Sequence, residues 1–278
     1  MSVNIDQLVG FQRAEFARAG RLRLWTIGAQ FAIGAPAIVS VFVDDYGTLF
    51  YLGLWGLVAF LIWFAASELQ ARSRIVAEQA RRATLVMGGL GKKISPAVLH
   101  EIQASLTVSR EAAAAQEDVN YFAANGEPGF SRLTEMLEET AFFTEDLQWV
   151  SSWVMHGTFA ISLLIAIGVF SVVLGVNDPL VRIQTARVVL AALMVFMSSD
   201  ILGAARAHKS TADQLKALRA RLAEIRARTF PEADVLLALS DYNAIVQSAP
   251  LIVPFAYQMR RHRLNQLWAK YKEDRTAR

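Results

Sequence analysis

The sequence predicts an all-α membrane protein with two transmembrane helix hairpins, which make four spans, and a helical cytoplasmic domain. Two observations support this fold class. Hydrophobic residues make up 54% of the 278 residues and charged residues only 19%, whereas soluble domains are about one quarter charged. The apolar residues are also concentrated in four stretches that carry few or no charges. A soluble globular protein of this length is therefore not expected.

The four predicted spans cover residues 24–43, 49–66, 157–176 and 188–205. The first contains twenty uncharged residues, which as a helix would be about 30 Å long and would match the hydrocarbon thickness of a bilayer. Only residues 44–48 connect it to the second span, so these two helices form an antiparallel hairpin. The fourth span is the weakest, because Asp200 interrupts it. We include it because the segments on either side of the third span would otherwise lie on opposite sides of the membrane.

The distribution of arginine and lysine predicts the orientation of the spans. Basic residues precede the first span, follow the second and follow the fourth, whereas the connections within the two hairpins carry none and two respectively. Because positive residues are retained on the cytoplasmic side, both termini and the central insert are expected to be cytoplasmic. The chain is thus divided into an N-terminal segment with hairpin 1 (1–66), an insert (67–149), hairpin 2 (150–205) and a tail (206–278).

The insert and the tail are long enough to form one compact helical domain. In the tail, Leu215, Leu218, Leu222 and Ile225 are spaced three, four and three residues apart. This spacing is typical of a coiled-coil seam of two heptads. Such a seam either packs inside the domain or joins the chain to a second copy, and the sequence leaves both possibilities open.

The residue composition argues against metal and thiol chemistry. The chain has no cysteine, and its four histidines lie more than 40 residues apart, so that no metal-ligand spacing is formed. We therefore expect neither an enzyme nor a cofactor. The formal net charge is only +3, and we expect no DNA or RNA polymer among the partners.

The end of the tail carries the candidate ligand site. Pro250 and Pro254 predict an extended turn between two helices. The residues that follow combine arginine with aromatic rings, a combination that can pair with phosphate and stack on a base. The predicted ligand-binding residues are Arg260, Arg261, Arg263, Tyr257 and Tyr242. Alternatively, the same arginines meet anionic lipid or water.

A second candidate site lies in the fourth span. Asp200 is the only acidic residue within a predicted span, and it follows Ser198 and Ser199. Ionisable groups inside a membrane usually face a bundle interior or a water-filled cavity. These three residues are therefore predicted to line a polar path, unless Asp200 merely reaches the membrane interface.

Two stretches of the tail, APLIVPFAY (249–257) and RRHRLNQLW (260–268), together with the two hairpins around a helical insert, resemble the SMODS-associating four-transmembrane effectors of bacterial cyclic-oligonucleotide-based antiphage signalling. The resemblance implies a multi-pass protein of the bacterial inner membrane. It further implies that the cytoplasmic domain binds a cyclic oligonucleotide second messenger made by a partner nucleotidyltransferase, and that the chain forms a homo-oligomer and permeabilises or disrupts the lipid bilayer. The residues alone also fit a non-enzymatic membrane sensor or scaffold that binds a protein partner through its cytoplasmic helices.

Overall fold

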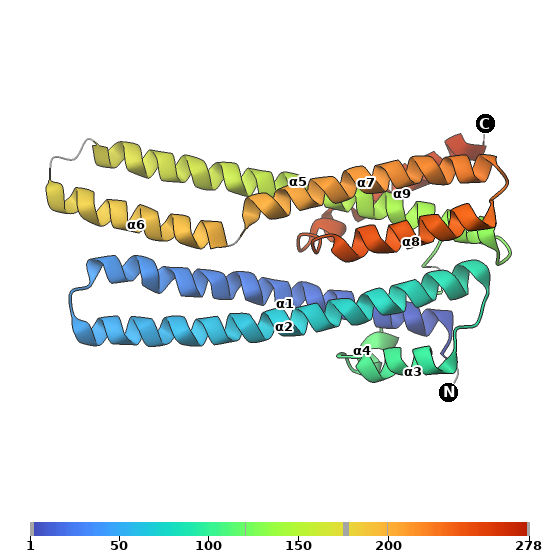
Figure 1. Ribbon diagram of the computed structural model, residues 1–278, viewed down its shortest axis with the longest axis horizontal. Helices are drawn as coiled ribbons and strands as arrows, with labels where there is room; N and C mark the ends of the chain where they lie inside the picture. The colour runs from blue at the N-terminus through green and yellow to red at the C-terminus, as the bar shows by residue number, and fades with distance from the viewer. Residues whose placement is uncertain (1–2, 120, 175–177, 199, 277–278) are drawn as a thin grey trace. The chain divides into compact units, whose positions relative to one another are not determined.

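The computed structural model describes the whole chain except residues 1–2, 120, 175–177, 199 and 277–278, and every regular element in this described part is a helix (Figure 1). The helices are α1 (Ile5–Val39), the short 3-10 helix η1 (Ser40–Phe42), α2 (Tyr46–Leu90), α3 (Pro96–Ser105), α4 (Arg110–Ala114), α5 (Phe130–Leu174), α6 (Pro179–Ser198), α7 (Ile201–Ala227), α8 (Glu232–Ser248) and α9 (Ala256–Thr276). The expected all-α class is confirmed.

The chain divides into two compact units. Unit 1 consists of residues 1–20, 71–152 and 207–278, and unit 2 consists of residues 21–70 and 153–206. The sequence had grouped residues 1–20 with the first hairpin. In the structure they belong to unit 1, because the first four turns of α1 pack against α2, α3 and α4 through Leu8, Phe11, Ala14, Ala80, Ala83, Ile102 and Ala113.

The main core of unit 1 joins α2, α5, α7 and α8. It contains Leu85 of α2, Leu133 and Leu137 of α5, and Val235 of α8. All four residues of the predicted seam, Leu215, Leu218, Leu222 and Ile225, are buried in this same cluster. The seam therefore packs within the chain, and the three-four-three spacing reflects a helix whose one face enters a core.

The N-terminal part of unit 1 is held by a buried carboxylate. Glu15 of α1 is completely buried and accepts hydrogen bonds from the backbone amides of Thr107 and Val108 at 2.6 and 3.1 Å. It also accepts from the hydroxyls of Thr107 and Ser73. These donors offset the cost of removing the carboxylate from water, and they tie the loop between α3 and α4 to α1 and α2.

Local sequence signals determine where α2 ends and α3 begins. Gly91 adopts a φ of +65° directly after the last residue of α2, a conformation that glycine adopts without steric cost. Four residues later, the hydroxyl of Ser95 accepts a hydrogen bond from the amide of Val98 at 3.4 Å, and Pro96 occupies the first position of α3. Proline is favoured there because it has no amide hydrogen to leave unpaired.

Unit 2 exposes many large apolar side chains among its described residues. Its large exposed residues include Trp25, Phe31, Phe50, Trp55, Leu164 and Ile165. Within the described residues, three helices are long and apolar enough to cross a membrane, at Ile5–Phe42, Tyr46–Leu90 and Phe130–Gly168, and a shorter apolar helix covers Ile183–Leu193. Exposed apolar surface of this extent is typical of a protein that contacts lipid.

The predicted fourth span, residues 188–205, does not form one uninterrupted helix in the structure. Helix α6 ends at Ser198 and α7 begins at Ile201, while Asp200 between them has a φ of +44°. The carbonyl of Asp200 accepts a hydrogen bond from the amide of Ala204 at 2.8 Å, so Asp200 stands at the N-terminal end of α7. Aspartate tolerates the left-handed region and is stabilised at the start of a helix, which explains why the chain breaks here.

Candidate functional site

Helix α9 lies antiparallel to α5 in unit 1, and a series of contacts defines this arrangement. From the start of α9 to its end, the partners on α5 move back along the chain. The pairs are Val253, in the turn just before α9, with Ser151, and then Arg260 with Asp146, Trp268 with Phe142 and Tyr271 with Glu138. The start of α9 therefore lies beside the last turn of α5 that belongs to unit 1.

Arg260 is held inside this interface. Its Nε and Nη2 donate to the two carboxylate oxygens of Asp146 at 3.0 and 2.5 Å, which is a bidentate ion pair. The hydrogen bonds to Asp146 raise the pKa of Arg260, against the smaller opposing effect of burial. Of the predicted ligand-binding residues, Arg260 thus already has a carboxylate partner 114 positions away.

A second arginine lies deeper between α5, α7 and α9. The guanidinium of Arg219 lies over the rings of Phe142 and Tyr271, with its central carbon 4.7 and 5.3 Å from the ring centroids. It also forms an ion pair with Glu145 at 2.6 Å. Cation–π contact and ion pairing together hold the three helices at this level.

The other predicted ligand residues are not gathered at one place. Arg261, Arg263 and Tyr257 are exposed on the surface of α9. Tyr242 of α8, by contrast, is buried to 1% exposure in the main core, and the guanidinium of Arg81 lies 4.7 Å from its ring centroid. Because this ring face is already covered, Tyr242 offers no open surface on which a base could stack.

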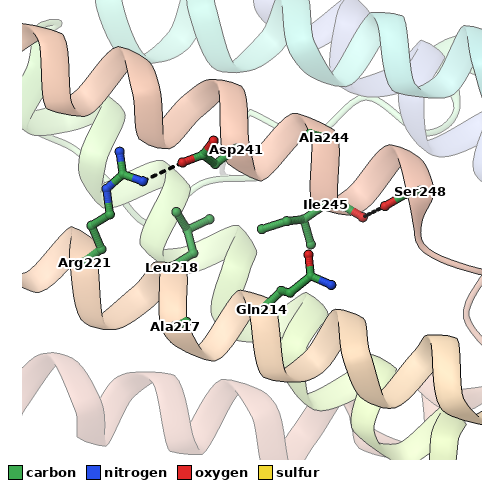
Figure 2. A pocket seen from close by; sticks show the side chains of 8 residues that line it. All are labelled: Gln214, Ala217, Leu218, Arg221, Asp241, Ala244, Ile245 and Ser248. Atoms are coloured by element: carbon green, nitrogen blue, oxygen red, sulfur yellow. Dashed lines mark hydrogen bonds and ion pairs between the residues drawn. The ribbon is translucent and has the colours of Figure 1, made fainter.

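A concave site that the sequence did not predict lies between α7 and α8. This α7–α8 groove has a volume of about 480 Å³ and is lined by Gln214, Ala217, Leu218, Arg221, Asp241, Ala244, Ile245 and Ser248. Figure 2 shows the side chains of Gln214, Leu218 and Ile245 projecting into the space between the two helices. The groove is open to solvent, unlike an enclosed cleft that buries most of a small ligand.

One ion pair spans the α7–α8 groove. Nη1 of Arg221 lies 2.5 Å from Oδ2 of Asp241, and the two side chains remain 38% and 49% exposed. An ion pair this exposed contributes little stability, so an anionic ligand can compete with Asp241 for the guanidinium. The groove therefore combines an apolar floor, an amide at Gln214 and an arginine that can be released for a phosphate.

The sequence contained a weak signal for this groove. Ala217 and Ala244 are small residues beside the apolar positions of their helices, and small side chains leave space between packed helices. Gln214 and Arg221 are seven residues apart and so lie on one face of α7. However, the closeness of α7 to α8 depends on how the main core packs, which the periodicity of either helix alone does not reveal.

The predicted polar path around Asp200 is only partly described. Ser199 lies outside the described residues, and of Ser198 only the backbone at the end of α6 is described. Asp200 is exposed, and its carboxylate lies over Gly203. Asp200 therefore starts a helix and does not stand in the middle of one.

In comparisons with known proteins, no protein family, curated protein or solved structure matches the chain.

Proposed function

We propose that the protein is a bacterial inner-membrane effector of antiphage defence. In this proposal unit 1 binds a cyclic oligonucleotide second messenger, the chain oligomerises, and unit 2 permeabilises the bilayer. The sequence resemblance supplies the ligand class and the setting. No described feature favours a scaffold that binds partners through the coiled-coil seam, because the seam residues are buried within unit 1.

The observation that carries the proposal is the continuity of two helices. Helices α2 and α5 are each 45 residues long, and each contains both an apolar segment long enough to cross a membrane and residues of the main core of unit 1. Leu85 belongs to α2, and Leu133 and Leu137 belong to α5. A ligand that shifts this core must move α2 or α5, and a helix transmits such a shift along its length because its backbone is rigid.

Within this proposal the ligand occupies the α7–α8 groove. The groove borders the main core, since Leu218 lines the groove and is also part of that core. It also contains the guanidinium of Arg221, which suits a phosphate diester. Filling the groove would push α7 away from α8 and so change how both helices pack on α5.

The proposal includes four spans with both termini in the cytoplasm. The fourth span would use α6 together with the start of α7, with Asp200 at the break between them. Reporter fusions after residues 43 and 176 are then both periplasmic. A cytoplasmic signal at either position contradicts this topology.

The test is the affinity of the detergent-solubilised protein for a panel of cyclic di- and trinucleotides. Arg221→Gln removes the phosphate partner and should weaken binding of the recognised nucleotide about tenfold, the lower end of the range for hydrogen bonds to charged groups. Asp241→Asn should have the opposite effect and strengthen binding, because it releases Arg221 and removes a negative charge from the groove. The opposite signs distinguish a local effect of charge from general damage.

A matched control is available close by. Arg228 and Asp234 form a similarly exposed ion pair at 2.8 Å, also bridging from the end of α7 to α8, but neither residue lines the groove. Arg228→Gln should leave the affinity unchanged. If Arg228→Gln and Arg221→Gln weaken binding equally, or if Asp241→Asn weakens it as well, the groove is not the ligand site.

A further inference from the structure

The turn between α8 and α9 is fixed at one end of unit 1 by two helices. On one side, Nη2 of Arg74 in α2 donates to the last carbonyls of α8 and the turn, those of Val246, Gln247 and Ala249. On the other side, α5 holds the turn itself. The amide nitrogen of Gln148 donates to the carbonyl of Pro250 at 3.1 Å, and the hydroxyl of Ser151 accepts from the amide of Val253 at 3.1 Å.

Both anchors stand next to the points where the chain passes into unit 2. Arg74 follows the last unit 2 residue of α2, Gln70, by four positions, and Ser151 precedes the first unit 2 residue of α5, Trp153, by two. At 1.5 Å per residue, these separations along the helices are about 6 Å and about 3 Å. The turn therefore lies at the level where α2 and α5 begin the segments that expose apolar side chains.

The residues at this end of unit 1 are apolar and exposed. Phe255, Tyr257 and Met259 have exposed fractions of 62%, 44% and 83%. Phe255 also adopts a φ of +68°, a conformation that is costly for a bulky side chain. Phe230 has a similar φ of +58°, but it packs against the main core. Phe255, by contrast, belongs to none of the hydrophobic clusters found among the described residues.

Basic residues follow at once. Arg261, His262 and Arg263 are all exposed on the next turn of α9, while Arg260 points inward to Asp146. Aromatic residues are enriched at the boundary between hydrocarbon and headgroups, and arginines beside them attract anionic lipid headgroups. The order along the chain, from apolar to basic, matches the order of layers encountered on leaving a bilayer.

We propose that residues 255–263 form a membrane-surface contact, in which Phe255, Tyr257 and Met259 enter the interfacial layer and Arg261 and Arg263 pair with anionic lipid headgroups. Charge complementarity and the position of the turn at the two anchors select a bilayer as the occupant. The contact rests on the part of the proposed function that places unit 2 in a membrane, but it requires no nucleotide and so goes beyond that function.

Because the chain has no cysteine, single introduced cysteines can be labelled uniquely. The experiment places an environment-sensitive fluorophore at Met259→Cys in the full chain, reconstituted in vesicles with lipids that carry a quencher just below the headgroup. Leu237→Cys is the matched control, since Leu237 is also an exposed apolar residue but lies eleven residues before the end of α8 at Ser248. Strong quenching at position 259 and weak quenching at 237 is the expected result. Equal quenching at the two positions overturns the proposal.

A second arm tests the arginines. Arg261→Gln and Arg263→Gln are introduced together in the Met259→Cys variant. In vesicles rich in anionic lipid, each substitution should shift the equilibrium between the membrane-bound, quenched state and the free state about fivefold toward the free state. The same pair should have little effect in purely zwitterionic vesicles. Lys216→Gln with Arg228→Gln is the control for an equal loss of charge and should leave quenching unchanged. If quenching depends on the protein-to-lipid ratio but not on the content of anionic lipid, a second copy of the chain covers this surface and the lipid contact is rejected.

Discussion

The two halves of α5 differ in how far their apolar side chains are exposed. In residues 130–152, which belong to unit 1, Leu133 and Leu137 are completely buried among residues of α2, α7 and α8. In residues 153–174, which belong to unit 2, Leu164 is 67% exposed and Ile165 62% exposed. In the first half of this continuous helix the apolar side chains are buried in a protein core. In the second half they are exposed, as on a helix that contacts lipid.

This difference shows that the apolar residues of the two halves face different surroundings. A leucine in the first half loses its contact with water by packing against protein. A leucine in the second half would face water over most of its surface unless lipid covers it. The comparison therefore supports membrane insertion more directly than the mean hydropathy of the whole chain.

The largest expected effect is on stability. Leu137→Ala should lower the free energy of unfolding by about 2.7 to 5 kcal/mol, because it leaves a cavity in the main core. Leu164→Ala should change it by only about 0.5 kcal/mol, since an exposed side chain leaves no cavity. Thermal unfolding of the purified protein in detergent measures both.

The comparison of the two halves fails if both leucine variants lose the same stability. A large loss for Leu164→Ala would mean that protein, and not lipid or detergent, covers the second half of α5. Leu133→Ala serves as a second buried position on the same helix and should behave like Leu137→Ala.

The second prediction concerns Glu139, which lies in the buried half of α5. Burial raises the pKa of Glu139 to about 7, against hydrogen bonds from the amide of Ala123 at 3.0 and 3.3 Å. Because the folded state holds this proton more tightly than the unfolded state, stability should fall as the pH rises from about 4.5 to about 7. At pH 8 the ionised carboxylate costs up to about 3 kcal/mol.

Glu139→Gln keeps an oxygen acceptor for Ala123 and removes the titration. The variant should therefore be more stable than the parent at pH 8 and nearly equal to it at pH 5, as followed by the midpoint of thermal unfolding at each pH. A gain in stability of equal size at both values would show that the carboxyl group does not titrate in this range.

Much of unit 1 could be predicted from local sequence. The spacing of Leu215, Leu218, Leu222 and Ile225 identified a buried face, and Gly91 and Ser95 marked helix ends, because these signals depend on a few neighbouring residues. The sequence did not indicate that residues 1–20 join unit 1. Their place depends on Glu15 meeting Thr107, a hydrogen bond across 92 positions.

The candidate site was less predictable for the same reason. Arg260, Arg261 and Arg263 look equivalent in the sequence, but Asp146 on another helix pairs with Arg260. Asp200 interrupts the helix predicted over residues 188–205, because an aspartate is better placed at the start of a helix than inside one. The α7–α8 groove exists only once the two helices have packed, so that no segment of the chain indicates it alone.

The smallest expected effect is the difference in stability between variants of Arg260 and Arg261. Arg260→Gln breaks a half-buried bidentate ion pair with Asp146 on the first half of α5 and should cost about 1 kcal/mol of stability. Arg261→Gln on the exposed side of α9 should cost almost nothing. Urea unfolding of both variants in detergent checks this difference, and equal losses would place Arg261 in a structural contact as well.

Leakage from dye-loaded proteoliposomes tests the central claim, that unit 1 controls the permeability of the membrane through unit 2. The protein is reconstituted, and a panel of cyclic di- and trinucleotides is added on the side of unit 1, each beside its linear counterpart. We predict rapid dye release with one cyclic nucleotide, none with its linear form, and a rightward shift of the dose response about tenfold in Arg221→Gln. The claim would be contradicted if the protein is inserted and binds one of the nucleotides, but the vesicles retain their dye with every nucleotide.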